Sequence, residues 1–192
     1  MDPKKIFPSI LRLTIMLIAC CSIKAEEPLN IKGCFIWPYA QCKGADLRHA
    51  NLAYKNLAGA DLTGANLARA DLRAANLGGA ILDGADLTGA NLKQANLSGA
   101  SLKGAKMVGV NLELARLLRT DLSQADLTAA NLEAARANFG WFVEANLTNA
   151  NVQETKFVAS NLKNANLEGA LIKYTIFPDA FMEGCKGCPK DW

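Results

Sequence analysis

The stretch "ADLTGANLARADLRAANLGGA", which spans residues 60–80, repeats one pattern every five residues. Each unit contains alanine, then asparagine or aspartate, then leucine, and then two variable positions. If Leu47 is taken as the centre of a unit, the frame runs without a slip from Cys42 to Met182. Of these 29 centres 20 are leucine and the others are apolar; alanine precedes 22 of them by two residues, and asparagine or aspartate precedes 18 by one. A period of five therefore governs most of the chain.

Neither a helix nor a straight strand accommodates this period. Five residues of an α-helix turn by about 500°, so successive leucines would be spread around the helix. In a strand, an odd step would place successive leucines on opposite faces. The pattern fits a chain that turns a corner in every unit, with alanine and leucine directed inward and Asn, Asp and Gly at the bends. Repeated corners of one hand give a coil whose turns stack at the strand spacing of about 4.8 Å.

The repeat resembles that of the pentapeptide-repeat family, whose signature A-[D/N]-L-x-x is found here over residues 40–184. The resemblance implies an all-β fold, a right-handed quadrilateral β-helix of about seven coils with one unit on each of four faces. Because the ends of a solenoid expose its interior, short caps are required. We expect residues 26–39 to form the N-terminal cap and residues 185–192 to form the C-terminal cap or tail.

The first 25 residues are typical of an export signal. Lys4 and Lys5 precede a short apolar run, and a small residue at Ala25 offers a cleavage site. A buried N-terminal helix is the alternative, which Pro8 disfavours. The stretch "LIAC" also resembles a bacterial lipoprotein signal, in which Cys20 would be lipidated and the protein tethered to a membrane. The sequence thus predicts an exported protein of the periplasm or a thylakoid-type lumen, membrane-associated only if Cys20 carries lipid.

Charge and composition favour a non-catalytic protein. The chain holds 21 basic and 18 acidic residues, and cleavage after Ala25 removes four basic and one acidic, which leaves 17 of each. A net charge of zero does not indicate a nucleic-acid partner. The single histidine, His49, has no evident catalytic neighbours, and no phosphate-binding loop is present. We expect no enzyme activity, no cofactor and no metal site.

Four cysteines remain after cleavage, and four allow three pairings. Cys34 and Cys42 lie at the start of the predicted rod, whereas Cys185 and Cys188 lie at its end, and bridged Cα atoms must lie within about 7 Å. We therefore expect one disulfide in each cap, Cys34–Cys42 and Cys185–Cys188. The alternative is that Cys185 and Cys188 form an exchanging pair in an envelope thiol-redox protein.

The outward positions break their polar pattern at one place. On a coil of twenty residues, positions twenty apart stack, so several outward apolar side chains gather into a patch on coils four to six. They are Leu118 and Val158 on either side of Asn138 in one column, Phe139 and Trp141 beside it, and Val143 on the next face. Exposed apolar patches of this kind usually mark contact sites. The patch could instead be covered by the chain's own tail.

These features predict an exported scaffold or protein-interaction module that binds an unidentified protein or a second copy of itself. The family resemblance raises a different possibility, since some members mimic duplex DNA and protect DNA gyrase. That role requires an acidic surface and a cytoplasmic address. The sequence indicates neither.

Overall fold

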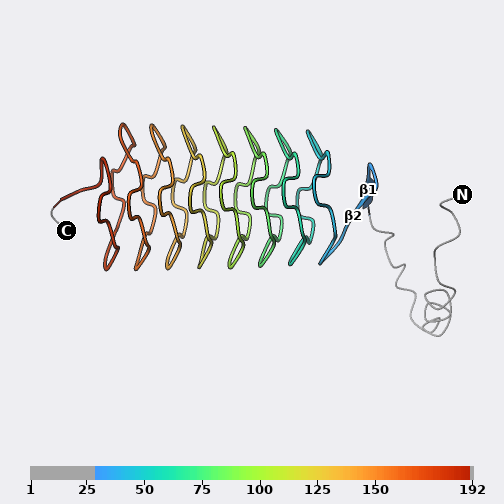
Figure 1. Cartoon of the computed structure of the whole chain (residues 1–192), viewed down its shortest axis with the longest axis horizontal. Coiled ribbons are helices and arrows are strands. Elements are labelled where there is room, and N and C mark those ends of the chain that lie inside the picture. Colours follow the sequence, from blue (N-terminus) through green and yellow to red (C-terminus); the bar gives the residue numbers. More distant parts are fainter. Residues whose placement is uncertain (1–28, 191–192) are drawn as a thin grey trace, which may run out of the picture.

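The computed structural model describes residues 29–190, which form a rod of stacked coils side by side along one axis (Figure 1). Parallel β-bridges join residues that are 20 apart, from Gln41↔Asp61 at one end to Asn166↔Lys186 at the other. One coil therefore takes twenty residues, or four units. No helix occurs within residues 29–190. The fold is the right-handed quadrilateral β-helix that the family resemblance implies.

A hairpin precedes the first coil at the N-terminal end of the rod (Figure 1). Strand β1 (Leu29–Ile31) pairs antiparallel with β2 (Cys34–Ile36), with Leu29 opposite Ile36. The connection, Lys32 and Gly33, has positive φ at both residues, as a tight two-residue hairpin loop requires. Cys34 and Ile36 are buried. The hairpin thus covers part of the interior that the first coil would otherwise expose.

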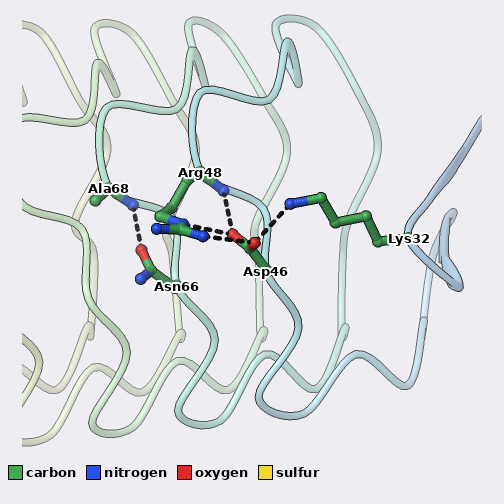
Figure 2. Close-up of polar contacts among 5 residues, drawn as sticks. All are labelled: Lys32, Asp46, Arg48, Asn66 and Ala68. Atoms are coloured by element: carbon green, nitrogen blue, oxygen red, sulfur yellow. Dashed lines mark hydrogen bonds and ion pairs between the residues drawn. The ribbon is translucent and has the colours of Figure 1, made fainter.

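An ion-pair cluster fastens this hairpin to the first coil. The Asp46 carboxylate accepts hydrogen bonds from the Lys32 ammonium, the Arg48 guanidinium and the Arg48 backbone N–H (Figure 2). Arg48 above all, and then Lys32, hold the pKa of the Asp46 carboxyl well below its usual range by donating these bonds. Because Lys32 belongs to the hairpin loop and Asp46 to the first coil, the charged contact links the cap to the rod.

The interior is a narrow stack of alanine and leucine. The leucines at the centres from Leu47 to Leu147 have no exposed surface, and nearly all of the alanines two residues before them are buried as well. Towards the C-terminal end aromatic rings replace leucine: the centroid of the Phe157 ring lies 5.2 Å from those of both Phe142 and Phe177. Gly140 makes room for this change, since a Cβ there would lie 2.9 Å from the Phe142 ring. The three centre positions that hold these rings therefore stay buried in the core, although larger side chains occupy them near the C-terminal end.

Every backbone N–H in five consecutive residues of the repeat has a partner, as residues 61–65 show. The N–H groups of Asp61, Leu62 and Gly64 donate to carbonyls of the neighbouring coils, and that of Ala65 closes the corner on Leu62. The remaining N–H, that of Thr63, donates to the Asp61 side chain at 3.2 Å. These residues thus satisfy all five donors without water, as a buried or stacked backbone must.

This last bond explains the asparagine and aspartate column. All 18 of these side chains accept a hydrogen bond from the N–H two residues later, as Asn66 does from Ala68 in Figure 2. Asn and Asp favour such bonds to nearby backbone. The carboxylates of the column are therefore capping groups of the corners and not a cation site.

The corner also demands a left-handed backbone at its second variable position. Glycine is common there, for example Gly109 with φ of 63°, but larger residues such as Leu114 adopt the same conformation, with φ of 60°. For a residue with a Cβ this conformation is strained by about 1 kcal/mol or more. Glycine at this position therefore stabilises the corner, and a residue with a Cβ there lowers the free energy of unfolding.

We predict that Leu92→Asp lowers the free energy of unfolding by at least about 3 kcal/mol, because it buries an unpaired carboxylate in the core. Leu114→Asp is the matched control: Leu114 is 43% exposed, so its replacement is expected to change stability by less than about 1 kcal/mol. Thermal unfolding followed by circular dichroism measures both. Equal midpoints for the two variants would contradict the assigned interior.

We further predict that Leu114→Gly raises the free energy of unfolding by about 0.5–1 kcal/mol, because it relieves the left-handed strain. Gly109→Leu, at the equivalent position of the preceding unit, is expected to lower it by a similar amount. A Cβ at Gly109 meets no atom within 4 Å, so crowding does not contribute. Chemical denaturation measures both changes, and the same sign for both would refute the explanation.

Candidate interaction surface

Three of the predicted apolar residues, Leu118, Phe139 and Val158, lie in the turns of one corner, whereas Trp141 begins the next face and Val143 lies in the turn that follows it. We call these five residues the apolar patch: Leu118, Phe139, Trp141, Val143 and Val158. The side chains of Leu118, Phe139 and Trp141 are 41%, 48% and 45% exposed, and those of the two valines are half-buried. The Phe139 N–H donates to the Val158 carbonyl, which sets these two residues on adjacent coils of the same corner. Asn138 lies in the same column, and its buried Oδ1 has no hydrogen-bond partner.

A second feature borders the patch, and sequence reasoning missed it. Arg116, Arg136 and Lys156 stack directly on one another, since parallel bridges join the first to the second and the second to the third. We call them the cation column. All three side chains are exposed. Arg116 and Lys156 each lie two residues before a patch residue, and Arg136 lies three residues before Phe139. The cation column and the apolar patch therefore form one continuous surface.

The same column has a different chemistry nearer the N-terminus. There it holds Asn56, Asn76 and Asn96, whose amides form a ladder: Asn76 Nδ2 donates to Asn56 Oδ1, and Asn96 Nδ2 to Asn76 Oδ1, both at 3.0 Å. Each of these asparagines also caps its own corner. The replacement of this amide ladder by three cations therefore removes bonds that the fold forms elsewhere.

The cations bring the fold no compensating bonds. Without Asn or Asp before them, the N–H groups of Leu118, Asn138 and Val158 lose the side-chain acceptor that caps other corners, and within residues 29–190 none gains another. Seven other basic residues form ion pairs, yet none of the cation column does in this part of the chain. A stack of like charges is itself destabilising. The column is thus an exposed and uncompensated positive stripe.

Positive charge continues from the column into the apolar patch. The Arg119 guanidinium lies over the Phe139 ring, 5.9 Å from its centroid, in a cation–π arrangement. On the other side of the column a shallow groove runs beside Leu114, Ala134 and Glu154. Glu154 is the single carboxylate that lines this groove. The surface therefore combines aromatic, aliphatic and cationic groups, with its charge almost entirely of one sign.

The last coil also exposes apolar side chains at outward positions, namely Leu171, Tyr174, Ile176 and Phe181. A shallow hollow at the C-terminal end is lined by Ile176 together with Phe177 and Met182. Trp192, the last residue of the expected C-terminal cap or tail, lies outside the described residues. Ile176 follows Lys156 in the same ladder, so this apolar end of the rod adjoins the cation column.

The cysteines form the two pairs that the sequence favours. Cys34 is bridged to Cys42 with Cα atoms 5.3 Å apart, and Cys185 to Cys188 with Cα atoms 5.7 Å apart. One disulfide thus ties the hairpin to the first coil, and the other closes a short loop after the last. The possible lipidation site, Cys20, precedes the described part of the chain.

Within residues 29–190, neither the single histidine nor the metal-ligating side chains form a site of their own. His49 lies exposed at a corner of the first coil. Across residues 29–190 no three metal-ligating side chains gather in a group that could hold an ion. Nor does this part of the chain contain a helix long and apolar enough to cross a membrane.

Comparison with known proteins bears on the fold and the family. The sequence profile of pentapeptide repeats matches residues 40–79, 70–107, 80–118, 95–133, 142–177 and 153–186. HetL, a pentapeptide repeat protein involved in heterocyst differentiation regulation in the cyanobacterium Nostoc sp. strain PCC 7120, is similar in structure. It is 32% identical over 76% of this chain and 75% of its own, with a TM-score of 0.55.

A second similar structure shows the fold alone. Trypsin-treated QnrB1, a plasmid-mediated fluoroquinolone resistance protein, has a TM-score of 0.56 with 76% of each chain covered, but it is only 17% identical. Among curated protein sequences none is significantly similar to this chain.

Proposed function

The chain belongs to the pentapeptide-repeat family, and from this premise we propose that it is an exported, non-catalytic interaction module that presents a rigid β-helical surface to a protein partner. The observation that carries the proposal is the apolar patch, which exposes the aromatic pair Phe139 and Trp141 beside Leu118. Tryptophan, phenylalanine and arginine are the residues that protein interfaces favour at their energetic centres.

The stiffness of the rod supports the same role. Because inter-coil hydrogen bonds hold each coil on both sides, the patch is fixed in place before a partner arrives. A surface that is already ordered loses little conformational entropy when it binds. A preformed surface of this kind suits a scaffold that binds a protein partner.

Export is the second part of the proposal. The charged start, apolar run and small-residue cleavage site of residues 1–25 support it. Disulfides persist in oxidising compartments, so the two bridges agree with a periplasm or an equivalent lumen. Cleavage before Cys20, with lipid attached there, is the variant in which the module would be anchored to a membrane.

The two alternative functions receive less support. A DNA mimic needs a continuous negative surface, whereas the cation column places an uncompensated positive stripe on this rod. A redox role for Cys185 and Cys188 would favour a helix N-terminus beside the thiols, whereas residues 29–190 contain no helix.

We predict that a photoreactive benzoylphenylalanine in place of Phe139 forms a covalent adduct with a partner protein in cells that produce the chain. The same group in place of Tyr54, which is also an exposed corner aromatic with positive φ, is the matched control and is expected to form none. Mass spectrometry of the adduct identifies the partner or a second copy. Absence of an adduct at Phe139, or equal labelling at Tyr54, would refute an interaction at the patch.

We also predict that the native protein has the intact mass of residues 26–192 with four fewer hydrogens, two for each disulfide. Reduction and alkylation of the same sample then report four cysteines. A chain that begins at Cys20 with added acyl mass would show the lipidated form instead. An uncleaved chain would contradict export.

A further inference from the structure

We infer that the partner bound at the apolar patch is a protein whose docking surface carries carboxylates, and that these pair with the cation column. This inference rests on the proposed function, because it names the class of partner for the same surface. Its starting point is that Arg116, Arg136 and Lys156 occupy positions where the fold itself favours asparagine.

The fold gains nothing from these three residues. Each replaces a side chain that would cap the next corner, and together they replace an amide ladder by a stack of like charges. No ion pair within residues 29–190 neutralises them. A feature that lowers stability and is left unpaired on the surface is best explained by a ligand of opposite charge.

The ligand is not a second copy of the same surface. Two-fold pairing of this face with itself would place Arg136 against Arg136 and Arg116 against Lys156, which is repulsive. Nor does any other outward column of the described coils supply the complement, since none stacks three carboxylates in a row. The longest acidic run is Glu113 above Glu133, and Glu113 is already paired with Lys93.

The apolar patch beside the column favours a protein over other polyanions. Recognition of a phosphate backbone requires positive charge but no apolar surface. A protein interface, in contrast, has an apolar centre with a charged rim, which is the arrangement of Phe139 and Leu118 next to Arg116 and Arg136. The planar guanidinium of arginine also matches a carboxylate with two parallel hydrogen bonds.

A flat anionic membrane fits the corner less well. On the far side of Phe139 the next face carries Trp141, and directly beneath it in the same ladder lies Asp121. A bilayer pressed against the corner would meet this carboxylate as well as the cations. A protein can place its carboxylates opposite the cation column and away from Asp121. A uniformly anionic membrane cannot do so.

The test uses a labelled peptide in which glutamate pairs alternate with leucine pairs, and a control peptide with glutamine in place of glutamate. Binding to the mature protein is measured by fluorescence anisotropy. The column variant combines Arg116→Asn, Arg136→Asn and Lys156→Asn, which restores the residue that the fold uses at this position. The matched control variant, with the same change in charge at exposed cations outside this surface, combines Arg69→Asn, Lys106→Asn and Lys186→Asn.

We expect the glutamate peptide to bind the native protein and the control variant alike, and the column variant at least about tenfold more weakly. The glutamine peptide is expected to bind the native protein and both variants as weakly as the glutamate peptide binds the column variant. Added salt is expected to weaken only the binding of the glutamate peptide. The column variant is also expected to have a raised thermal midpoint, because three caps and the amide ladder return. Weaker binding by a more stable protein cannot be attributed to misfolding.

Equal binding of the glutamate peptide to the native protein and the column variant, or no binding at all, would overturn the inference. Sedimentation with phosphatidylglycerol vesicles that depends on the column, without peptide binding, would overturn it in favour of a membrane. The photoreactive group at Phe139 separates the two proposals. An adduct there without charge-dependent peptide binding refutes only the acidic partner, whereas no adduct refutes the interaction module and this inference with it.

Discussion

The closed interior of the rod is the constraint from which the other features follow. Four faces meet around a space so narrow that one residue per unit must be alanine-sized and another must fill the remainder, as Ala65 and Leu67 do without any exposed surface. The chain can bury both only by turning after every fifth residue. Each turn breaks the backbone out of a regular strand, and the N–H groups released there need acceptors. The neighbouring coils and the Asn or Asp side chains supply them, so the polar column is as much a consequence of the core as the apolar one.

Much of this could be read from the sequence because the core imposes it on every unit. The period of five predicts corners and coils, and the positions of Cys34 and Cys185 at opposite ends of the repeat predict their partners. The number of faces and the hand of the coil rest on the family resemblance, since spacing alone does not say how many corners close a coil. The contact of Asp46 with Lys32 could not be predicted, because it depends on how the hairpin folds back onto the first coil.

The interaction surface was predicted only in part, for a physical reason. Large apolar residues at outward positions, such as Phe139 and Trp141, contradict the expectation that surfaces are polar, and so they attract notice. Arginine and lysine at outward positions do not, because charged residues are normal on a surface. The signal lay in the column: every twentieth residue from Asn56 reads Asn, Asn, Asn, Arg, Arg, Lys. It becomes informative once the capping role of asparagine is known, since only then does Arg116 represent a lost bond.

The cation column also changes what a net charge of zero means for this protein. A total over residues 26–192 averages charges along the whole rod, whereas screening at physiological salt limits a partner to those within about 8 Å. Within that distance of Arg136 the column neighbours Arg116 and Lys156 stack at the strand spacing of about 4.8 Å, so a docking partner meets a locally basic surface. Neutrality of the chain as a whole is compatible with this because carboxylates such as Asp46 and Asp71 are already engaged with Arg48 and Arg73 near the other end. In a solenoid, the charge that a docking partner meets is therefore set by the residues stacked in one column and not by the net charge of the whole chain.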